Sequence, residues 1–275
     1  MRIVSWNVNG RLGACSKIEQ LEQLEQPHIS RCQDIVSILQ ATKPDIVCLQ
    51  EVNSREEAAW IARQLNMFQP KWPVWHVAGL TILTRFPIIE IQVQSIPNSF
   101  YNGIVAVKVS NPEKKHAIWV VNIHLDSRAY THSEQRRHVE TQFILRYITR
   151  LLQKQKAPIV VAGDWNSVDH HDLRVATTRN QCKRIRDIGR LPSHLMQREQ
   201  WNDAMHLYSH ERRTSTWIPT AAQDPHCTIE RIDRIYVKGL QVRFAQHIGP
   251  KETRVILHGR PWPTGKDHKL VLAEM

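Results

Sequence analysis

The sequence lacks any hydrophobic run of about 20 residues, the length that a membrane-spanning helix needs. Its first residues, "MRIVSWNVNG", show a strand-like pattern that leaves no room for the basic, apolar and cleavage regions of a signal peptide. These two absences argue against a membrane protein and against a secreted protein. We therefore expect a cytoplasmic protein that does not associate with membranes.

Cysteine is scarce and shows none of the spacings that bind structural metal. The five cysteines are Cys15, Cys32, Cys48, Cys182 and Cys227, and none of them forms a C-x-x-C pair. This pattern argues against a disulfide framework and against a structural zinc site. The chain also lacks the H-E-x-x-H motif of zinc proteases and the G-x-S-x-G motif of serine hydrolases.

Acidic residues are outnumbered by basic ones. The 37 Lys and Arg against 26 Asp and Glu give a net charge of +11, and the sequence pI is near 9.7. A basic excess favours a polyanionic partner, which means nucleic acid, an anionic membrane or a phosphorylated small molecule. The charge does not choose among these partners, and a basic surface can also be no more than a solvated face.

No linker rich in Gly, Pro and Ser divides the 275 residues, a length that suits one large domain. We therefore expect residues 1–275 to form a single domain. Helical spacing of apolar residues predicts helices at Ile29–Ala41, Arg55–Leu65 and His132–Gln155. The basic, weakly periodic stretch from His170 to Thr216 has the character of an inserted loop region.

Short runs rich in β-branched residues alternate with these helices. They are "RIVSWNV", "DIVCLQEV", "LTILTRFPIIEIQVQSI", "GIVAVKVS", "HAIWVVNIHL", "PIVVAGDWN", "RIDRIYV" and "KLVLAEM". Each has the length and composition of a β-strand. Strands and helices in alternation predict an α/β fold.

Polar residues gather where these strands end. They are Asn7, Glu51, His124, Asp164, Asn166, Asp233, Asp267 and His268. Taken singly, an Asp or Asn after a strand is usually a turn former or a helix cap. Burying so many such groups together would be costly unless they bind something, and one divalent cation with a phosphate would satisfy them. Carboxylate and amide oxygens without thiolates suit Mg²⁺, or Mn²⁺, rather than zinc.

The two-residue period of a strand predicts which of these side chains share a side. It places Asn122, His124 and Asp126 on one side of their strand. By the same rule Asp164 and Asn166 share a side, and the residue between them, Trp165, faces away.

Six motifs together resemble the endonuclease/exonuclease/phosphatase superfamily, the group of the type-I deoxyribonucleases and the exonuclease-III-like AP endonucleases. The motifs are "SWNVNG", "CLQEV", "NIHL", "GDWN", "RIDRIYV" and "KDH", in the order that the superfamily shows. The resemblance extends from Arg2 to Glu274. It implies a four-layered α/β sandwich in which two packed, mostly antiparallel β-sheets are flanked by helices.

The resemblance also implies a metal site. Glu51 would be the principal ligand of Mg²⁺, Asn7 would lie near the metal and the phosphate, and Asp267 would support the metal network. Phosphodiester hydrolysis needs charge neutralisation at the phosphate, which a metal ion supplies.

The same resemblance implies catalytic roles for five residues. Asp164 would orient and deprotonate the attacking water, and Asn166 would hold the phosphate or the nucleophile. His268, oriented by Asp233, would bind a phosphate oxygen. His124 would contact the phosphate or assist the leaving group.

The motif "HLDSR" and the helix "SEQRRHVETQFILRYI" are similar to the 5′-tyrosyl-DNA phosphodiesterase branch, although Trp165 stands where that branch usually has Thr. Arg128 either contacts a phosphate next to the scissile one or, like Arg136 and Arg137, caps or solvates a helix. Trp217 either stacks on a base or packs in the core.

The leading hypothesis is a monomeric, divalent-metal-dependent phosphodiesterase, a hydrolase that acts on nucleic acid and on DNA rather than RNA. The alternatives are a phospholipid or inositol-phosphate hydrolase of the same superfamily and a binding module without activity. The basic, Pro-containing loops oppose a lipid substrate, and the filled catalytic positions oppose an inactive scaffold. The sequence leaves open endonuclease against exonuclease activity and the nature of the leaving group.

Overall fold

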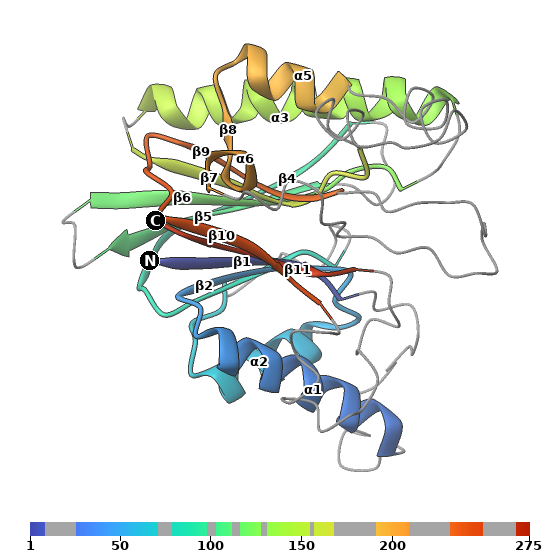
Figure 1. Cartoon of the computed structure of the whole chain (residues 1–275), viewed down its shortest axis with the longest axis vertical. Helices are drawn as coiled ribbons and strands as arrows, with labels where there is room; N and C mark the ends of the chain where they lie inside the picture. Colours follow the sequence, from blue (N-terminus) through green and yellow to red (C-terminus); the bar gives the residue numbers. More distant parts are fainter. Residues whose placement is uncertain are drawn as a thin grey trace.

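The computed structural model describes residues 1–8, 26–70, 79–97, 103–111, 116–127, 131–154, 157–167, 191–208, 232–249 and 268–275. Two β-sheets pack face to face, and helices cover the outer face of each (Figure 1). The four-layered α/β sandwich expected from the family resemblance is confirmed.

The first sheet has five strands. In spatial order they are β10 (Phe244–Ile248), β11 (Leu270–Glu274), β1 (Arg2–Asn7), β2 (Ile46–Gln50) and β3 (Thr81–Thr84). β1 and β2 run parallel, and the other neighbours run antiparallel.

The second sheet has six strands. In spatial order they are β4 (Ile88–Ser95), β5 (Gly103–Asn111), β6 (His116–His124), β7 (Ile159–Asp164), β9 (Asp233–Lys238) and β8 (Asn202–Asp203). β6 and β7 run parallel, and the other neighbours run antiparallel. The expectation of mostly antiparallel sheets is confirmed, and each sheet holds one parallel pair.

Two helices cover each sheet. α1 (Gln26–Thr42) and α2 (Arg55–Leu65) lie on the first sheet, and α3 (Thr131–Lys154) and α5 (Leu191–Arg198) lie on the second (Figure 1). The side chain of Ser54 caps α2 by accepting a hydrogen bond from the backbone N–H of Glu57, which is the usual signal for a helix start. The three helices expected from the sequence are confirmed, with bounds that differ by at most a few residues.

Three apolar layers separate the four structural layers. Val47 and Ile38 pack between the first sheet and its helices, and Ile82 and Val120 pack between the sheets. Ile144 of α3 packs on the outer face of the second sheet. The strands of the two parallel pairs, β1 with β2 and β6 with β7, are therefore buried on both faces. This burial explains their continuous apolar sequences.

One predicted strand is two strands in different sheets. The run "LTILTRFPIIEIQVQSI" contains β3, an edge strand of the first sheet, and β4, an edge strand of the second. Pro87 lies between them, and a proline has no N–H to donate to a β-ladder. The chain crosses from one sheet to the other at this point.

The expectation of a loop region at His170–Thr216 is wrong for the residues that the structure describes there. Residues 191–208 form α5, β8 and the short helix α6 (Ala204–Tyr208). Met196, Trp201 and Met205 are buried. These elements are too short for a period to be recognised in the sequence.

Among the described helices, none has both the length and the apolar character that crossing a membrane would require.

Candidate active site

The candidate site lies where the two parallel strand pairs end. Asn7 ends β1, and Glu51 follows the last residue of β2. In the second sheet His124 and Asp164 are paired as the last residues of β6 and β7. Because parallel strands end at one edge of a sheet, each parallel pair brings its carboxyl-end side chains together.

The side-chain amide of Asn7 joins the two sheets at the site. Its Nδ2 donates to Glu51 Oε1 at 3.1 Å and to Asp164 Oδ2 at 2.9 Å. Asn7 is fully buried. One amide therefore holds a carboxylate from each sheet within a few ångströms of the other.

Glu51 has a left-handed backbone conformation, with a φ of 55°. A left-handed residue with a Cβ costs about 1–2 kcal/mol. Gly79 packs directly against this turn, since a Cβ added there would lie 2.5 Å from the carbonyl oxygen of Val52. The N–H of Val52 donates to the carbonyl of Gly79 at 3.0 Å, which holds the turn that presents Glu51.

His124 is buried between the two carboxylates. Its Nε2 lies 3.8 Å from Glu51 Oε1 and 3.7 Å from Asp164 Oδ2. Among the described residues neither ring nitrogen has a hydrogen-bond partner. A buried imidazole in this state is suited to contact a bound group.

The motif "GDWN" places its residues on two sides of the second sheet. The backbone N–H of Asn166 donates to Asp164 Oδ1 at 2.9 Å, and Asn166 Nδ2 donates to the carbonyl of Leu125 at 3.0 Å. Trp165 is fully buried on the helix side, with its ring edge-on to Tyr236 at 4.9 Å. The predicted orientation of Trp165 away from Asp164 is confirmed.

Gly163 allows β6 and β7 to approach at this motif. A Cβ at Gly163 would overlap the carbonyl oxygen of Ile123 on β6. A glycine is therefore required immediately before Asp164.

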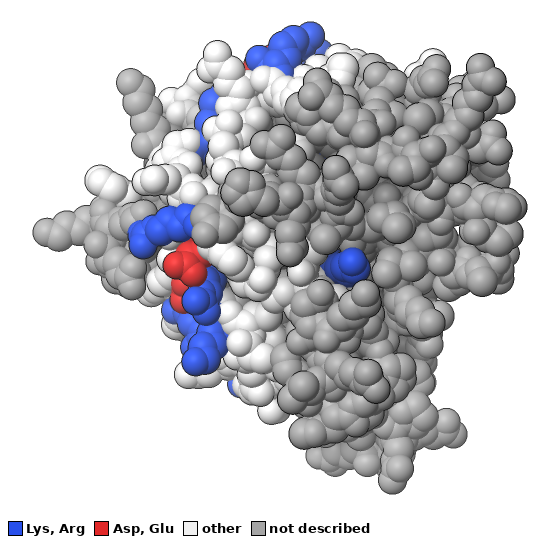
Figure 2. Space-filling model, in the orientation of Figure 1, with Lys and Arg blue, Asp and Glu red and all other residues white. Residues whose placement is uncertain are grey.

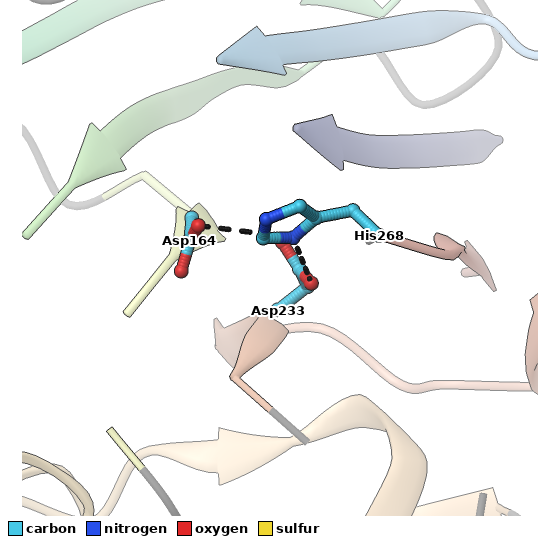
Figure 3. A group of neighbouring side chains, drawn as sticks. All are labelled: Asp164, Asp233 and His268. Atoms are coloured by element: carbon cyan, nitrogen blue, oxygen red, sulfur yellow. Dashed lines mark hydrogen bonds and ion pairs between the residues drawn. The ribbon is translucent and has the colours of Figure 1, made fainter. Parts of the chain in front are cut away.

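His268 and Asp233 form a buried ion pair (Figure 3). His268 Nδ1 lies 3.0 Å from Asp233 Oδ2 and 3.8 Å from Asp164 Oδ2. Burial lowers the pKa of His268, but Asp233, together with Asp164 and Glu51, outweighs burial and raises this pKa to about 9. The imidazole is therefore a cation at neutral pH.

Two overlapping sets of residues could hold a divalent cation. Asp164, Asp233 and His268 offer ligand atoms within 4.8 Å of one another. In that set, however, His268 Nδ1 already binds Asp233. Glu51 and Asp164, whose oxygens meet at the Asn7 amide, form the second set, and their carboxylates suit Mg²⁺ or Mn²⁺. We favour Glu51 of the second set as the principal ligand, because this choice leaves the His268–Asp233 pair intact and keeps Asp164 available for another role.

The charge of the site also fits a cation. Among the described residues, three carboxylates, those of Glu51, Asp164 and Asp233, lie around the imidazolium of His268. Buried like charges raise the free energy of the fold unless a counter-charge is bound. The donor set and the excess negative charge both agree with the metal expected from the sequence.

Three expected site residues, Asp267, Arg128 and Trp217, lie outside the residues that the structure describes. The expectation that Asp126 shares the side of Asn122 and His124 is wrong. β6 ends at His124, and the carboxylate of Asp126 instead accepts a hydrogen bond from Arg136 of α3 at 3.2 Å.

Two further residues of α3 hold the segment that follows β6, and the sequence reasoning missed this role. Arg137 Nη1 donates to the carbonyl of Asp126 at 2.8 Å, and Glu140 Oε2 accepts a hydrogen bond from the N–H of Asp126 at 3.0 Å. Arg137 and Glu140 are 1% and 2% exposed, so charged residues face inward here. Polarity patterns place such residues on the solvent side, which is why no sequence signal revealed them.

The described surface does not locate a nucleic-acid interface. In Figure 2 the described Lys and Arg side chains of this face form no continuous patch, and several of them lie beside acidic side chains at one edge. Arg2 and Glu274 form an ion pair in which Nε and Oε2 are 3.0 Å apart.

Comparison with known proteins agrees with the sequence motifs. A model of the endonuclease/exonuclease/phosphatase family matches residues 4–255. No curated protein sequence is similar to the chain at a significant level.

Solved structures share the fold at low sequence identity. Truncated Caenorhabditis elegans TDP2 is 19% identical with a TM-score of 0.66, covering 99% of this chain and 95% of that one. D. rerio TDP2 complexed with single strand DNA product is 17% identical with a TM-score of 0.66, covering 99% and 97%. The human Nocturnin catalytic domain with bound sulfate anion is 18% identical with a TM-score of 0.68, covering 99% and 93%.

Proposed function

Because the chain belongs to the endonuclease/exonuclease/phosphatase family, we propose that it is a divalent-metal-dependent phosphodiesterase that hydrolyses phosphodiester bonds in nucleic acid. One observation carries this proposal. The carboxylates of Glu51 and Asp164, joined by Asn7, lie next to the cationic imidazole of His268, which is paired with Asp233. A phosphate needs both kinds of partner, since its oxygens bind cations and its phosphorus must be attacked by an activated water.

Glu51 and Asn7 would hold Mg²⁺, with Mn²⁺ as the other candidate, and Asp267 would support the same ion. The cation would neutralise charge on the phosphate oxygens. Glu51 is suited to this role because the left-handed turn presents its carboxylate beside the Asn7 amide.

Asp164 would act as the base. Its Oδ1 is held by the N–H of Asn166, and its Oδ2 is held by Asn7. Oδ2 would take a proton from the attacking water as the new P–O bond forms and the P–O bond to the leaving group breaks. A positioned base of this kind contributes on the order of 10² to 10⁴ in rate.

His268, kept as a cation by Asp233, would bind an equatorial phosphate oxygen. His124, whose Nε2 lies between Glu51 and Asp164, would contact the phosphate or give a proton to the leaving oxygen. Asn166 would hold the phosphate or the nucleophile. These roles place each charge where charge develops in the transition state.

Three observations support nucleic acid as the substrate, with DNA preferred over RNA. The net charge is +11, the "HLDSR" motif is similar to the 5′-tyrosyl-DNA phosphodiesterase branch, and a structurally similar TDP2 was solved with a single strand DNA product. Within this proposal Arg128 would contact a neighbouring phosphate and Trp217 would stack on a base. The reaction would be that of an endonuclease or of a 5′-tyrosyl-DNA phosphodiesterase.

The test compares the wild-type protein with Asp164→Asn and Glu51→Gln on plasmid DNA, an RNA strand, a 5′-phosphotyrosyl oligonucleotide and sphingomyelin, each with Mg²⁺ and with EDTA. We expect turnover of a DNA substrate that EDTA abolishes and that Asp164→Asn lowers by about 10² to 10⁴. Glu51→Gln should bind Mg²⁺ more weakly in calorimetry. Turnover of sphingomyelin alone would contradict the proposal that the substrate is nucleic acid. Turnover that EDTA does not change would contradict the proposed dependence on a divalent metal.

A further inference from the structure

Gln50 and Asn122 form a hydrogen-bonded bridge between the two sheets beside the site. Gln50 is the last residue of β2 and precedes Glu51, and Asn122 lies two residues before His124 on β6. Gln50 Nε2 donates to Asn122 Oδ1 at 2.7 Å. Both side chains are fully buried, so the bond is shielded from water.

Asn122 also binds the backbone of the first sheet. Its Nδ2 donates to the carbonyls of Leu49 and Thr81 at 2.8 and 2.9 Å. Leu49 and Thr81 face each other at the end of the β2–β3 ladder. A single side chain of the second sheet therefore makes three hydrogen bonds to the first.

Gln50 is itself held in place within the first sheet. Its Nε2 contacts Ser5 Oγ at 3.3 Å and the carbonyl of Cys48 at 3.2 Å. The amide that reaches across to Asn122 is thus fixed from its own side.

Apolar packing alone does not fix how the two sheets are aligned. Side chains such as Ile82 and Val120 fill the space between the sheets, and their contribution depends on buried area rather than direction. Buried hydrogen bonds are directional, and sliding one sheet along the other would leave their polar groups without partners. The bridge therefore favours one alignment of the sheets.

We propose that the Gln50–Asn122 bridge is a positioning element that sets the separation between the two halves of the site. Asn7 and Glu51 come from the first sheet, and His124 and Asp164 come from the second. Neither Gln50 nor Asn122 needs to touch metal or substrate for this role. The effect on turnover rests on the proposed function, whereas the effect on geometry does not.

The test uses Gln50→Met, which keeps the length of the side chain and removes its amide. Tyr147→Phe is the matched control, because the Tyr147 hydroxyl donates to Gln92 Oε1 at 3.0 Å and joins α3 to β4 on the other face of the second sheet. Both variants should melt a few degrees below wild type. Only Gln50→Met should lengthen the Asn7–Asp164 hydrogen bond in a crystal structure, weaken Mg²⁺ binding by about 10- to 100-fold in calorimetry, and lower kcat with little change in KM.

A Gln50→Met protein with an unchanged Asn7–Asp164 distance and unchanged Mg²⁺ affinity would overturn the proposal, even if its melting temperature fell. Should Gln50→Met not fold, Ser5→Ala provides a milder perturbation, since it removes one contact of the Gln50 amide. We expect Ser5→Ala to weaken Mg²⁺ binding several-fold, and an unchanged affinity would count against the bridge. A wild-type protein that cleaves no substrate would contradict the proposed function. The Asn7–Asp164 distance in the crystal structure of Gln50→Met would still test the positioning role of the bridge.

Discussion

His268 is the residue whose protonation couples the site to the stability of the fold. Its pKa is about 9 in the folded protein against 6.5 for a free histidine, because Asp233, Asp164 and Glu51 outweigh the effect of burial. A raised pKa stabilises the fold at pH values below 6.5, and the stabilisation is lost as the pH rises through 9. A difference of this size corresponds to about 3 kcal/mol.

We therefore predict that replacing His268 by Gln lowers the free energy of unfolding most at about pH 6, and that this loss shrinks from pH 6.5 upward and disappears above about pH 9. Chemical denaturation of both proteins in EDTA from about pH 6 to pH 10 measures this difference. A difference that stays constant over the range would show that the imidazole is not held as a cation. Turnover by the wild-type protein should fall over the same upper pH range.

At the scale of single residues, the sequence predicted much of the candidate site. Asn7, Glu51, His124, Asp164, Asn166, Asp233 and His268 were expected from strand ends and motifs, and the structure brings them together. The Gln50–Asn122 bridge was not predicted. It depends on how two sheets align across their interface, and no local period in a sequence carries that information.

At the scale of elements, α3 anchors Asp126, which follows β6. Arg137 donates to the carbonyl of Asp126, and Arg136, on the more exposed side, donates to its carboxylate. The exposure of the two arginines differs, since Arg137 is 1% exposed and the side chain of Arg136 is 40% exposed. Asp126 is therefore held by one buried arginine, through its backbone, and by one partly exposed arginine, through its side chain.

We predict that Arg137→Met lowers the free energy of unfolding by about 2–3 kcal/mol, because the carbonyl of Asp126 loses a charged donor inside the protein. Arg136→Ala should cost less, about 1 kcal/mol, because Arg136 is partly exposed although its partner Asp126 is buried. Urea denaturation of both variants measures the contrast. Equal losses would mean that burial does not decide the strength of this anchor.

The element boundaries show why part of the fold was missed. α2 has the bounds predicted from its apolar spacing, Arg55–Leu65, and in the structure Ser54 and Asn66 cap its two ends. β3 and β4 were read as one strand because their apolar runs are continuous except at Pro87, and nothing local states that the two runs join different sheets. The single domain over residues 1–275, the monomeric state and the cytoplasmic location stay predictions from the sequence.

At the scale of the whole molecule, a net charge of +11 should make binding to nucleic acid strongly dependent on salt. We predict that the inactive Asp164→Asn protein binds a DNA oligonucleotide about a hundredfold more weakly when salt rises from about 50 to 200 mM, as four neutralised phosphates would require. Fluorescence anisotropy measures this dependence. If binding did not change with salt concentration, the basic residues would only face solvent and would not contact phosphates.

The left-handed turn at Glu51 has a consequence for the evolution of this protein and its descendants. Glycine adopts a φ of 55° without strain, so stability alone would favour glycine at position 51. In a gene copy released from selection for activity, mutation of this glutamate to glycine would be tolerated and would even stabilise the protein. A glutamate kept at this strained position is therefore a mark by which active descendants could be told from inactive ones.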